Sequence, residues 1–378
     1  MSATTYAHLG PEQLELLRGT EALARDVLAP LARAATPGRI DRPLVRALAE
    51  HGLLERVLGG KGEIPALDLC LIREGLARHC TEAETAFALQ GLGAHPILAH
   101  GAPEVAGEWL PPLARGEAVC GFALTEPGAG SDVAALALRA ARDGDGFLLT
   151  GEKTYISNAP DADVYSVFAR TSERGLTAFA VPRASEGLTG EPLALLARHP
   201  IGRLVFDGVR VPGDHVLGEV DRGFKVAMRT LDLFRPSVGA FAVGMAQAAV
   251  DAAVAHVTTR RAFGGTLSEL QGVSHQLADV AAAVQGARLL VHGAASAYDR
   301  GIRPTTAAAA MAKLFATETA QRAIDVAIQV HGARALEQGH LLEHLYREVR
   351  ATRIYEGASE VQREVIARQL FRDATSVA

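Results

Sequence analysis

Residues 120–132 read CGFALTEPGAGSD, and the character of the chain changes at this stretch. Before it, from about residue 11 to 119, apolar side chains recur at helical spacing, as in LELLRGTEALARDVLAPLARAA and ALDLCLIREGLARHC. After it, from about 120 to 225, short β-type runs such as FLLTGEKTYIS and LTAFAVP are separated by Gly, Pro and Asp turns. The stretch therefore predicts a boundary between a helical region and a β region.

Long helices are predicted again from Gly223 onward. Segments such as TAAAAMAKLFATETAQRAIDVAIQV and HLLEHLYREVRATRIY are amphipathic, and the many Ala residues on helix faces permit the close packing of a four-helix bundle. The sequence thus predicts an α+β multidomain fold in three parts. These are an N-terminal α-helical domain (1–119), a small middle β-barrel or β-sandwich domain (120–225) and a C-terminal α-helical bundle domain (226–378).

Bulk properties limit the function classes. The 378 residues are 48% hydrophobic and 21% charged with a net charge of −5, so no polycationic surface for nucleic acid or membrane is indicated. The three cysteines, Cys70, Cys80 and Cys120, match no zinc spacing, and we expect them to be reduced and buried in a cytoplasmic protein without a metal. The first residues lack the pattern of a signal peptide, and the uncharged run 236–250 is too short to span a bilayer.

The stretch 120–132 is also a candidate binding loop. It predicts a strand end that runs into a Pro/Gly-rich turn with Thr125, Ser131 and several exposed backbone N–H groups. Such a loop can hydrogen-bond a flat heterocycle or hold an anion. Taken alone, it fits a plain hairpin loop equally well.

Several further motifs occur in order along the chain: GEKTYISNAPDADVYSVFAR, GFKVAMRTLDLFRP, RRAFGG, IQVHGARAL and YREVRATRIYEGASEVQREVIARQL. Together with CGFALTEPGAGSD, they resemble the acyl-CoA dehydrogenase family over about residues 11–372, most densely from 120 onward. The resemblance implies an enzyme that uses FAD to convert an acyl-CoA thioester to a trans-2-enoyl-CoA. It also implies a role in fatty acid or lipid metabolism and a homodimer at least, with a homotetramer expected.

The resemblance assigns the flavin contacts position by position. Phe122, Leu124 and Thr125 match residues that line and hydrogen-bond the flavin ring, and Tyr155 and Ser157 match a second flavin-contacting strand. The other matches lie beside the cofactor or reach the FAD of a neighbouring subunit: Gly130, Ser131, Arg260, Phe263, Gln271, Gln329, Val330, Gly332, Ala358 and Glu360. Without the family context, Tyr155 would be interpreted as a core aromatic and Arg260 as part of a solvated helix end.

Substrate contacts follow from the same resemblance. The matching positions are Ser131, Asp232, Arg235, Gly357 and Arg368. Each of the charged residues among them would also fit a surface ion pair.

Glu356, in RIYEGASEVQ, is the candidate catalytic base. The residues before it predict a helix that Gly357 can end, and Ser359 with Gln362 predicts a capping box on the next helix. Negative charge is unfavourable near a helix C-terminus, and an apolar pocket would raise the carboxyl pKa further. Both effects favour a proton acceptor, whereas in an unrelated chain an exposed turn residue would be the default interpretation.

The mechanism that the resemblance implies places Glu356 next to the thioester. The Glu356 N–H and a ribityl hydroxyl of FAD stabilise the enolate oxygen, Glu356 takes the α-proton, and flavin N5 accepts the β-hydrogen as hydride. An electron-transfer flavoprotein is the expected acceptor of the electrons. Some relatives place their base one residue before the Arg of LDLFRP, but that position is Phe234 here. Glu356 is therefore expected to be the sole base, and Phe234 to favour short or branched acyl groups.

Departures from the family pattern keep alternatives open. The usual Gly-Gly-x-Gly is 332–335, Gly-Ala-Arg-Ala, and Ala358 replaces a usual Thr. A dehydrogenase of thioesters on an acyl carrier protein, an acyl-CoA oxidase on the same fold, and a flavin-free scaffold homologue remain alternatives. Glu356 argues against the flavin monooxygenases of this fold.

Overall fold

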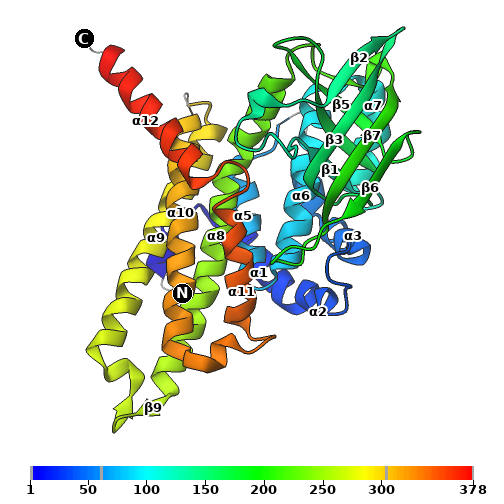
Figure 1. Cartoon of the computed structure of the whole chain (residues 1–378). Coiled ribbons are helices and arrows are strands. Elements are labelled where there is room, and N and C mark those ends of the chain that lie inside the picture. Colours follow the sequence, from blue (N-terminus) through cyan, green and yellow to red (C-terminus); the bar gives the residue numbers. More distant parts are fainter. Residues whose placement is uncertain (1–2, 60–62, 303–304, 377–378) are drawn as a thin grey trace. The chain divides into compact units, whose positions relative to one another are not determined.

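The computed structural model describes residues 3–59, 63–302 and 305–376, so the remaining residues of the predicted N- and C-terminal domains lie outside it. Helical elements come first, strands follow, and long helices close the chain (Figure 1). This order confirms the predicted fold class. The early helical elements are η1 (Ala3–Tyr6), α1 (Pro11–Leu23), η2 (Ala24–Leu28), α2 (Ala29–Ala32), α3 (Arg42–Glu50), α4 (Leu53–Leu58), α5 (Ala66–Ala77), α6 (Thr81–His100) and α7 (Pro103–Ala114).

The β region forms one mixed sheet. Its strands are β1 (Cys120–Ala123), β2 (Arg139–Asp143), β3 (Gly146–Ser157), β4 (Val164–Arg170), β5 (Leu176–Pro182), β6 (Leu188–Pro192), β7 (Ile201–Val211) and β8 (Val216–Leu217), with short helical turns η3 (Val133–Ala135) and η4 (Gly213–His215). They are ordered β6-β7-β3-β2-β4-β5-β8, and β1 pairs with β4 in parallel. The interior strands β4 and β5 are almost entirely buried, and the predicted runs FLLTGEKTYIS and LTAFAVP lie within β3 and β5.

The last part of the chain is helical apart from a short hairpin. Its elements are α8 (Gly223–Thr259), β9 (Arg261–Ala262), β10 (Gly265–Thr266), η5 (Leu267–Glu269), α9 (Gln271–Asp299), α10 (Thr306–His331), η6 (Gly332–Leu336), α11 (Leu341–Thr352) and α12 (Ser359–Ser376). Small residues allow α8 to approach its neighbours closely. A Cβ on Gly239 would meet Val291 of α9 at 2.7 Å, and one on Gly244 would meet the Glu74 carbonyl of α5 at 2.5 Å.

Packing divides the chain into two compact units. Unit 1 comprises Met1–Asp26, Ala66–Glu84 and Asp232–Ala378, and unit 2 comprises Val27–Pro65 and Thr85–Leu231. The helices before the first strand are thus shared between the two units, and within unit 1 α1 packs against α5, which packs against α9. This division into two units does not test the three predicted domains, which stay a prediction.

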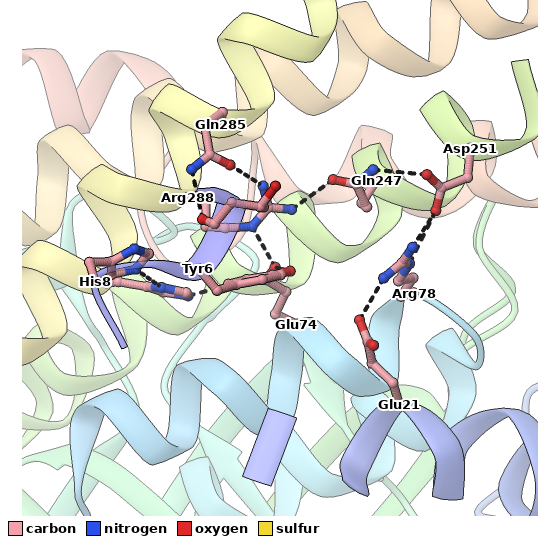
Figure 2. Close-up of polar contacts among 11 residues, drawn as sticks. Tyr6, His8, Glu21, Glu74, Arg78, Gln247, Asp251, Gln285 and Arg288 are labelled. Atoms are coloured by element: carbon pink, nitrogen blue, oxygen red, sulfur yellow. Dashed lines mark hydrogen bonds and ion pairs between the residues drawn. The ribbon is translucent and has the colours of Figure 1, made fainter. Parts of the chain in front are cut away.

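A buried polar network ties α5 to α9 and to the N-terminal segment inside unit 1 (Figure 2). The Glu74 carboxylate accepts hydrogen bonds from the Tyr6 hydroxyl at 2.8 Å and from Arg288 Nε at 2.7 Å, and it lies 3.0 Å from His292 Nε2. His292 in turn bonds His8 at 2.8 Å. Because Glu74 and Arg288 are almost completely buried, these contacts make the charges tolerable in the core.

One helix of the described residues, α8, is long and apolar enough to cross a membrane by length and composition. However, 72% of its most apolar window is buried inside the chain. That burial is typical of a core helix.

Candidate active site

Backbone strain marks three of the predicted site residues. Among the described residues, five that are not glycine have a left-handed φ: Tyr155, Asn158, Asp221, Phe263 and Glu356. Each such conformation costs about 1–3 kcal/mol, and such residues cluster at functional sites. Three of them, Tyr155 (φ 55°), Phe263 (φ 52°) and Glu356 (φ 50°), are residues to which the family motifs assign a role.

The predicted flavin contacts of the β region belong to unit 2. Phe122 lies on β1 and packs against Phe168, with ring centroids 4.9 Å apart. Leu124 is buried and Thr125 is half-buried just after the strand, whereas Gly130 and Ser131 are exposed on the following turn. The structure therefore brings these residues together along one strand end and its loop.

A buried ion pair stands behind this loop. Lys153 of β3 is fully buried, and its Nζ donates to the Leu124 carbonyl and to Glu126 Oε1, both at 2.8 Å. The Glu126 carboxylate also accepts from the N–H groups of Ala137 (2.6 Å) and Leu138 (2.9 Å). These bonds fix the turn between β1 and η3, which holds Thr125 in place.

Tyr155 lies on a β-bulge. The pairing of β3 with β7 shifts register between Lys153 and Ile156, and the Thr154 N–H bonds the Thr125 carbonyl at 3.0 Å. A bulge re-aims a side chain, and Tyr155 is 57% exposed. The alternative of a core aromatic is therefore wrong, because the bulge turns the ring out of the sheet's core face. Ser157 follows, half-buried, at the end of the same strand.

We expect Lys153→Met to weaken both the fold and flavin retention. The change leaves the buried Glu126 carboxylate without its cation, and breaking a buried pair costs about 3–5 kcal/mol. Thermal unfolding and the flavin-to-protein absorbance ratio measure the two effects. Lys225→Met, which removes an exposed lysine from the same unit, should change neither. Full flavin content in the Lys153 variant would contradict a role of the ion pair in shaping the loop.

Glu356 lies in unit 1, at the corner between α11 and α12. The helix α11 ends at Thr352, so the predicted helix through Tyr355 is wrong in its last turn. Residues 353–356 form a turn, in which Glu356 is the last residue with a φ of 50°, and Gly357 follows with a φ of 95°. The φ of Gly357 favours glycine, and a Cβ there would also meet Gln362 Nε2 at 2.3 Å, so the Gln362 side chain would have to move.

The predicted capping box is wrong as well. The Ser359 hydroxyl donates to Glu318 Oε1 at 2.7 Å, and the Gln362 amide donates to the carbonyls of Gly357 (2.9 Å) and Glu356 (3.3 Å). The two side chains thus hold the corner instead of capping α12. The physical reason is that two consecutive left-handed residues turn these carbonyls toward Gln362.

Electrostatics favour Glu356 as a proton acceptor. The residue is half-buried, and its Oε2 atom is buried with no hydrogen-bond partner among the described residues. Burial raises the pKa of Glu356, although the charges of Arg73, Lys313 and Arg235 act to lower it. An orphaned buried carboxylate oxygen with a raised pKa is the property that a general base needs.

Asp232 and Arg235 lie beside this corner on α8. Arg235 donates to Asp232 Oδ1 at 2.8 Å and to the Glu356 carbonyl at 3.4 Å, and Asp232 Oδ2 accepts from Thr306. Ala358 is half-buried between Gly357 and α12, and Glu360 is exposed in the first turn of α12. Arg368 is also exposed, and its Nε bonds Glu364 at 2.8 Å. It lies about three helical turns after the corner.

The remaining predicted residues lie at the hairpin and at helix ends of unit 1. Arg260 follows α8, and Phe263 forms the hairpin tip with 92% of its surface exposed. Also exposed or half-exposed are Gln271 at the start of α9 and Gln329, Val330 and Gly332 at the end of α10.

Four polar residues around the two groups were missed in the sequence. Lys153 shares a strand face with Phe147 and Leu149, so a buried cation could have been suspected from the alternation. Lys313 shares the α10 stripe of Ala309, Ala316 and Ala320, a similar signal. Glu126 and Arg73 have no comparable signal, because their burial depends on the packing of other segments.

The unit 2 group fits a flavin. Within the described chain, the hydroxyls of Thr125, Ser131, Tyr155 and Ser157 make no hydrogen bond, so all four are available to a ligand. The exposed Tyr155 ring offers an aromatic surface beside them. Polar hydroxyls with an aromatic ring on a fixed loop suit a flat, hydrogen-bonding heterocycle.

Family comparisons agree over most of the chain. Residues 10–117, 121–209 and 221–371 match the N-terminal, middle and C-terminal domains of acyl-CoA dehydrogenases. The chain is 36% identical over 362 residues to cyclohexane-1-carbonyl-CoA dehydrogenase of Geobacter metallireducens, covering 93% of this chain and 95% of that one. It is 37% identical over 380 residues to the mitochondrial short-chain specific acyl-CoA dehydrogenase of Sus scrofa, covering 97% and 92%.

A solved structure gives the same result. Butyryl-CoA dehydrogenase from Megasphaera elsdenii superposes with a TM-score of 0.90 at 32% identity, over 96% of this chain and 99% of that chain. The fold and the buried carboxylate corner define a flavin-dependent oxidoreductase. The chain belongs to the acyl-CoA dehydrogenase family. The FAD cofactor and the dehydrogenase activity that the motifs predicted are confirmed at the level of this family.

Proposed function

We propose that this protein removes the α-proton of an acyl-CoA thioester with Glu356 and oxidises the Cα–Cβ bond to a trans-2-enoyl-CoA. The observation that carries the assignment is the Glu356 corner. Glu356 has a strained left-handed backbone, and its Oε2 atom is buried without a hydrogen-bond partner among the described residues.

The protein's part in the reaction is alignment and proton transfer. Thr125, Ser131, Tyr155 and Ser157 would hold FAD, which when bound accepts the β-hydrogen together with its bonding electrons. The Glu356 backbone N–H supports the thioester oxygen as negative charge develops there, and its carboxylate takes the α-proton. Gly357 permits the corner that aims the carboxylate.

Phe234 supports a short or branched acyl group. Its ring is fully buried on α8, one residue before Arg235, which donates to the Glu356 carbonyl. Names of two similar proteins, which specify a cyclohexane-1-carbonyl and a short-chain substrate, are in keeping with a compact acyl group.

The test is anaerobic titration of the yellow protein with a panel of acyl-CoAs. We expect four-carbon and branched or cyclic acyl-CoAs to bleach the flavin rapidly and sixteen-carbon acyl-CoA to bleach it slowly or not at all. Phe234→Ala should shift the preference toward longer chains, because it removes the ring volume. Equal rates for short and long chains in the parent protein would contradict the chain-length proposal, and no bleaching by any thioester would contradict dehydrogenation.

Partners and assembly are also proposals. Arg260, Phe263, Gln271 and Gln329 are exposed as contacts to the FAD of a second subunit would require, so we propose a homodimer at least and a homotetramer as the full assembly. An electron-transfer flavoprotein is the proposed electron acceptor, and the cytoplasm the proposed location. Reoxidation of the reduced enzyme in air within seconds would instead favour an acyl-CoA oxidase. Bleaching of the flavin by an acyl-carrier-protein thioester, but not by acyl-CoA, would favour the acyl-carrier alternative.

A further inference from the structure

Three side chains from three helices donate to the two carbonyls of the Glu356 corner. Lys313 of α10 donates to the Gly357 carbonyl at 2.7 Å, where Gln362 of α12 also donates at 2.9 Å. The Glu356 carbonyl accepts from Gln362 at 3.3 Å and from Arg235 of α8 at 3.4 Å. We call Lys313, Gln362 and Arg235 the carbonyl clamp. It holds both left-handed residues of the corner from outside the turn.

Lys313 is the unusual member of the clamp. It is fully buried in a stripe of alanines on α10, where a lysine is costly. Its ammonium makes one hydrogen bond within the described chain, to the neutral Gly357 carbonyl, and no carboxylate there lies within ion-pair distance. A buried cation without a direct counter-ion needs another explanation, and it points at the corner that holds the base.

We propose that Lys313 is a positioning residue for the base, holding the left-handed corner through the Gly357 carbonyl and placing a positive charge beside the Glu356 carboxylate. This inference rests on the proposed role of Glu356 and deepens it. It assigns Lys313 no contact with substrate or cofactor.

The two parts of the role have separate consequences. The hydrogen bond opposes relaxation of Gly357 out of its φ of 95°, which would swing the Glu356 carboxylate away from its position. The charge favours the ionised, proton-accepting form of Glu356, in the same direction as Arg73 and Arg235. Burial in turn lowers the pKa of Lys313 to about 8, opposed by the Glu356 charge, so the ammonium is charged at neutral pH.

Other charged groups act on this pair from the surrounding helices. Besides Glu356, the groups that act on Lys313 are Arg235 of α8, Glu318 of α10 and Glu360 of α12. Arg73 of α5 acts on Glu356 and is itself held by a buried ion pair with Glu84 and a 2.6 Å bond to Ser237. None of these groups changes in the variants below, so a shift in the pH profile reports on Lys313.

The experiment compares FAD-loaded Lys313→Met, which loses the donor and the charge, with Lys313→Gln, which keeps an uncharged donor. In Lys313→Met we expect kcat to fall about 10²-fold, the cost of misplacing a reacting group by about 1 Å. In both variants the acidic limb of kcat/KM should move up by about one pH unit, because losing the cation raises the pKa of the base. Thr317→Val is the matched control. Thr317 is buried one turn further along α10 and bonds only carbonyls of its own helix, so that variant should keep the parent pH profile.

A crystal structure of Lys313→Met provides a readout that does not depend on turnover. We expect the Gly357 carbonyl to rotate and Glu356 to leave its left-handed φ. A variant with an unmoved corner and an unmoved acidic limb would overturn the proposal, even if its stability fell. Failure of the proposed function is a different result: the parent protein would then show no thioester-dependent bleaching, or Glu356→Gln would retain it.

Discussion

Glu356→Gln should abolish bleaching of the flavin by acyl-CoA while the protein keeps its FAD. Gln has nearly the shape of Glu but cannot accept the α-proton, and general base catalysis contributes about 10²–10⁴-fold to a rate. Because Phe234 occupies the position where some relatives carry a base, no second carboxylate is expected to substitute for Glu356. Anaerobic stopped-flow absorbance of the flavin band measures the loss directly.

The stability of the same variant excludes misfolding as the cause. A carboxyl whose folded pKa is raised stabilises the fold at low pH, and this contribution is lost as pH rises through the folded pKa. Above its folded pKa the ionised Glu356 therefore destabilises the fold, and in that pH range Gln should leave the melting temperature unchanged or higher. Glu12→Gln, an exposed carboxylate in the first turn of α1, is the control that should keep full activity. Retained bleaching in Glu356→Gln would remove Glu356 from the mechanism.

The raised pKa also gives the parent enzyme a characteristic pH profile. Glu356 accepts a proton only when it is ionised, so kcat/KM should fall on the acidic side at a pH above the usual range of a carboxyl group. The affinity for FAD should not fall over the same pH range, because FAD binding does not require the Glu356 charge. Spectrophotometric pH profiles of turnover and of flavin retention separate the two.

The parts of this site that could be predicted from sequence are those that depend on local pattern. Periodicity gave the order of helices and strands, and the motifs located Glu356, Tyr155 and Phe263 before their left-handed backbone was known. The conformation of Glu356 was not predictable in the same way. It depends on Lys313, Gln362 and Arg235, which lie up to 121 positions away along the chain.

Errors at the corner have the same origin. The sequence predicted a helix through Tyr355 and a capping box from Ser359 to Gln362, both of which are sound local rules. In the structure the helix stops at Thr352, and Ser359 and Gln362 instead bond Glu318 and the corner carbonyls. Tertiary hydrogen bonds outweighed local capping at a strained functional turn, which is where local rules are expected to fail.

Glu74→Leu should cause a large loss of stability, because one buried carboxylate contacts Arg288, Tyr6 and His292. The variant leaves Arg288 buried without its carboxylate and removes the partner of Tyr6 and His292 (Figure 2). Removing one member of a buried pair costs about 3–5 kcal/mol. Chemical denaturation at neutral pH measures the change in unfolding free energy, and Asp251→Asn is the control. Asp251 is also drawn in Figure 2, but its side chain is 45% exposed, so its ion pair with Arg78 should contribute at most about 1 kcal/mol.

A double variant separates the pair from the packing around it. Replacing both charges, as in Glu74→Leu with Arg288→Met, leaves no unpaired ion in the core and should recover most of the lost stability. Recovery would show that the single change is costly because it leaves the Arg288 guanidinium buried without a counter-ion. If the double variant is as unstable as Glu74→Leu, the network instead acts by fastening the N-terminal segment through Tyr6 and His8.

The pH dependence of stability tests whether Glu74 is ionised in this network. Burial alone would raise the pKa of Glu74, but the Arg288 charge and the contacts with His292 outweigh it and hold that pKa well below its usual range. A carboxyl with a depressed folded pKa stabilises the fold above its unfolded pKa, and this contribution is lost as pH falls toward the folded value. The parent protein should therefore lose stability steeply below about pH 4, whereas the double variant should lose it with a smaller slope. The unfolding free energy of both proteins can be measured by urea denaturation from pH 7 to pH 3. If it falls with pH equally in both, Glu74 is not ionised in the folded protein, and Arg288 and His292 then contact a neutral carboxylic acid.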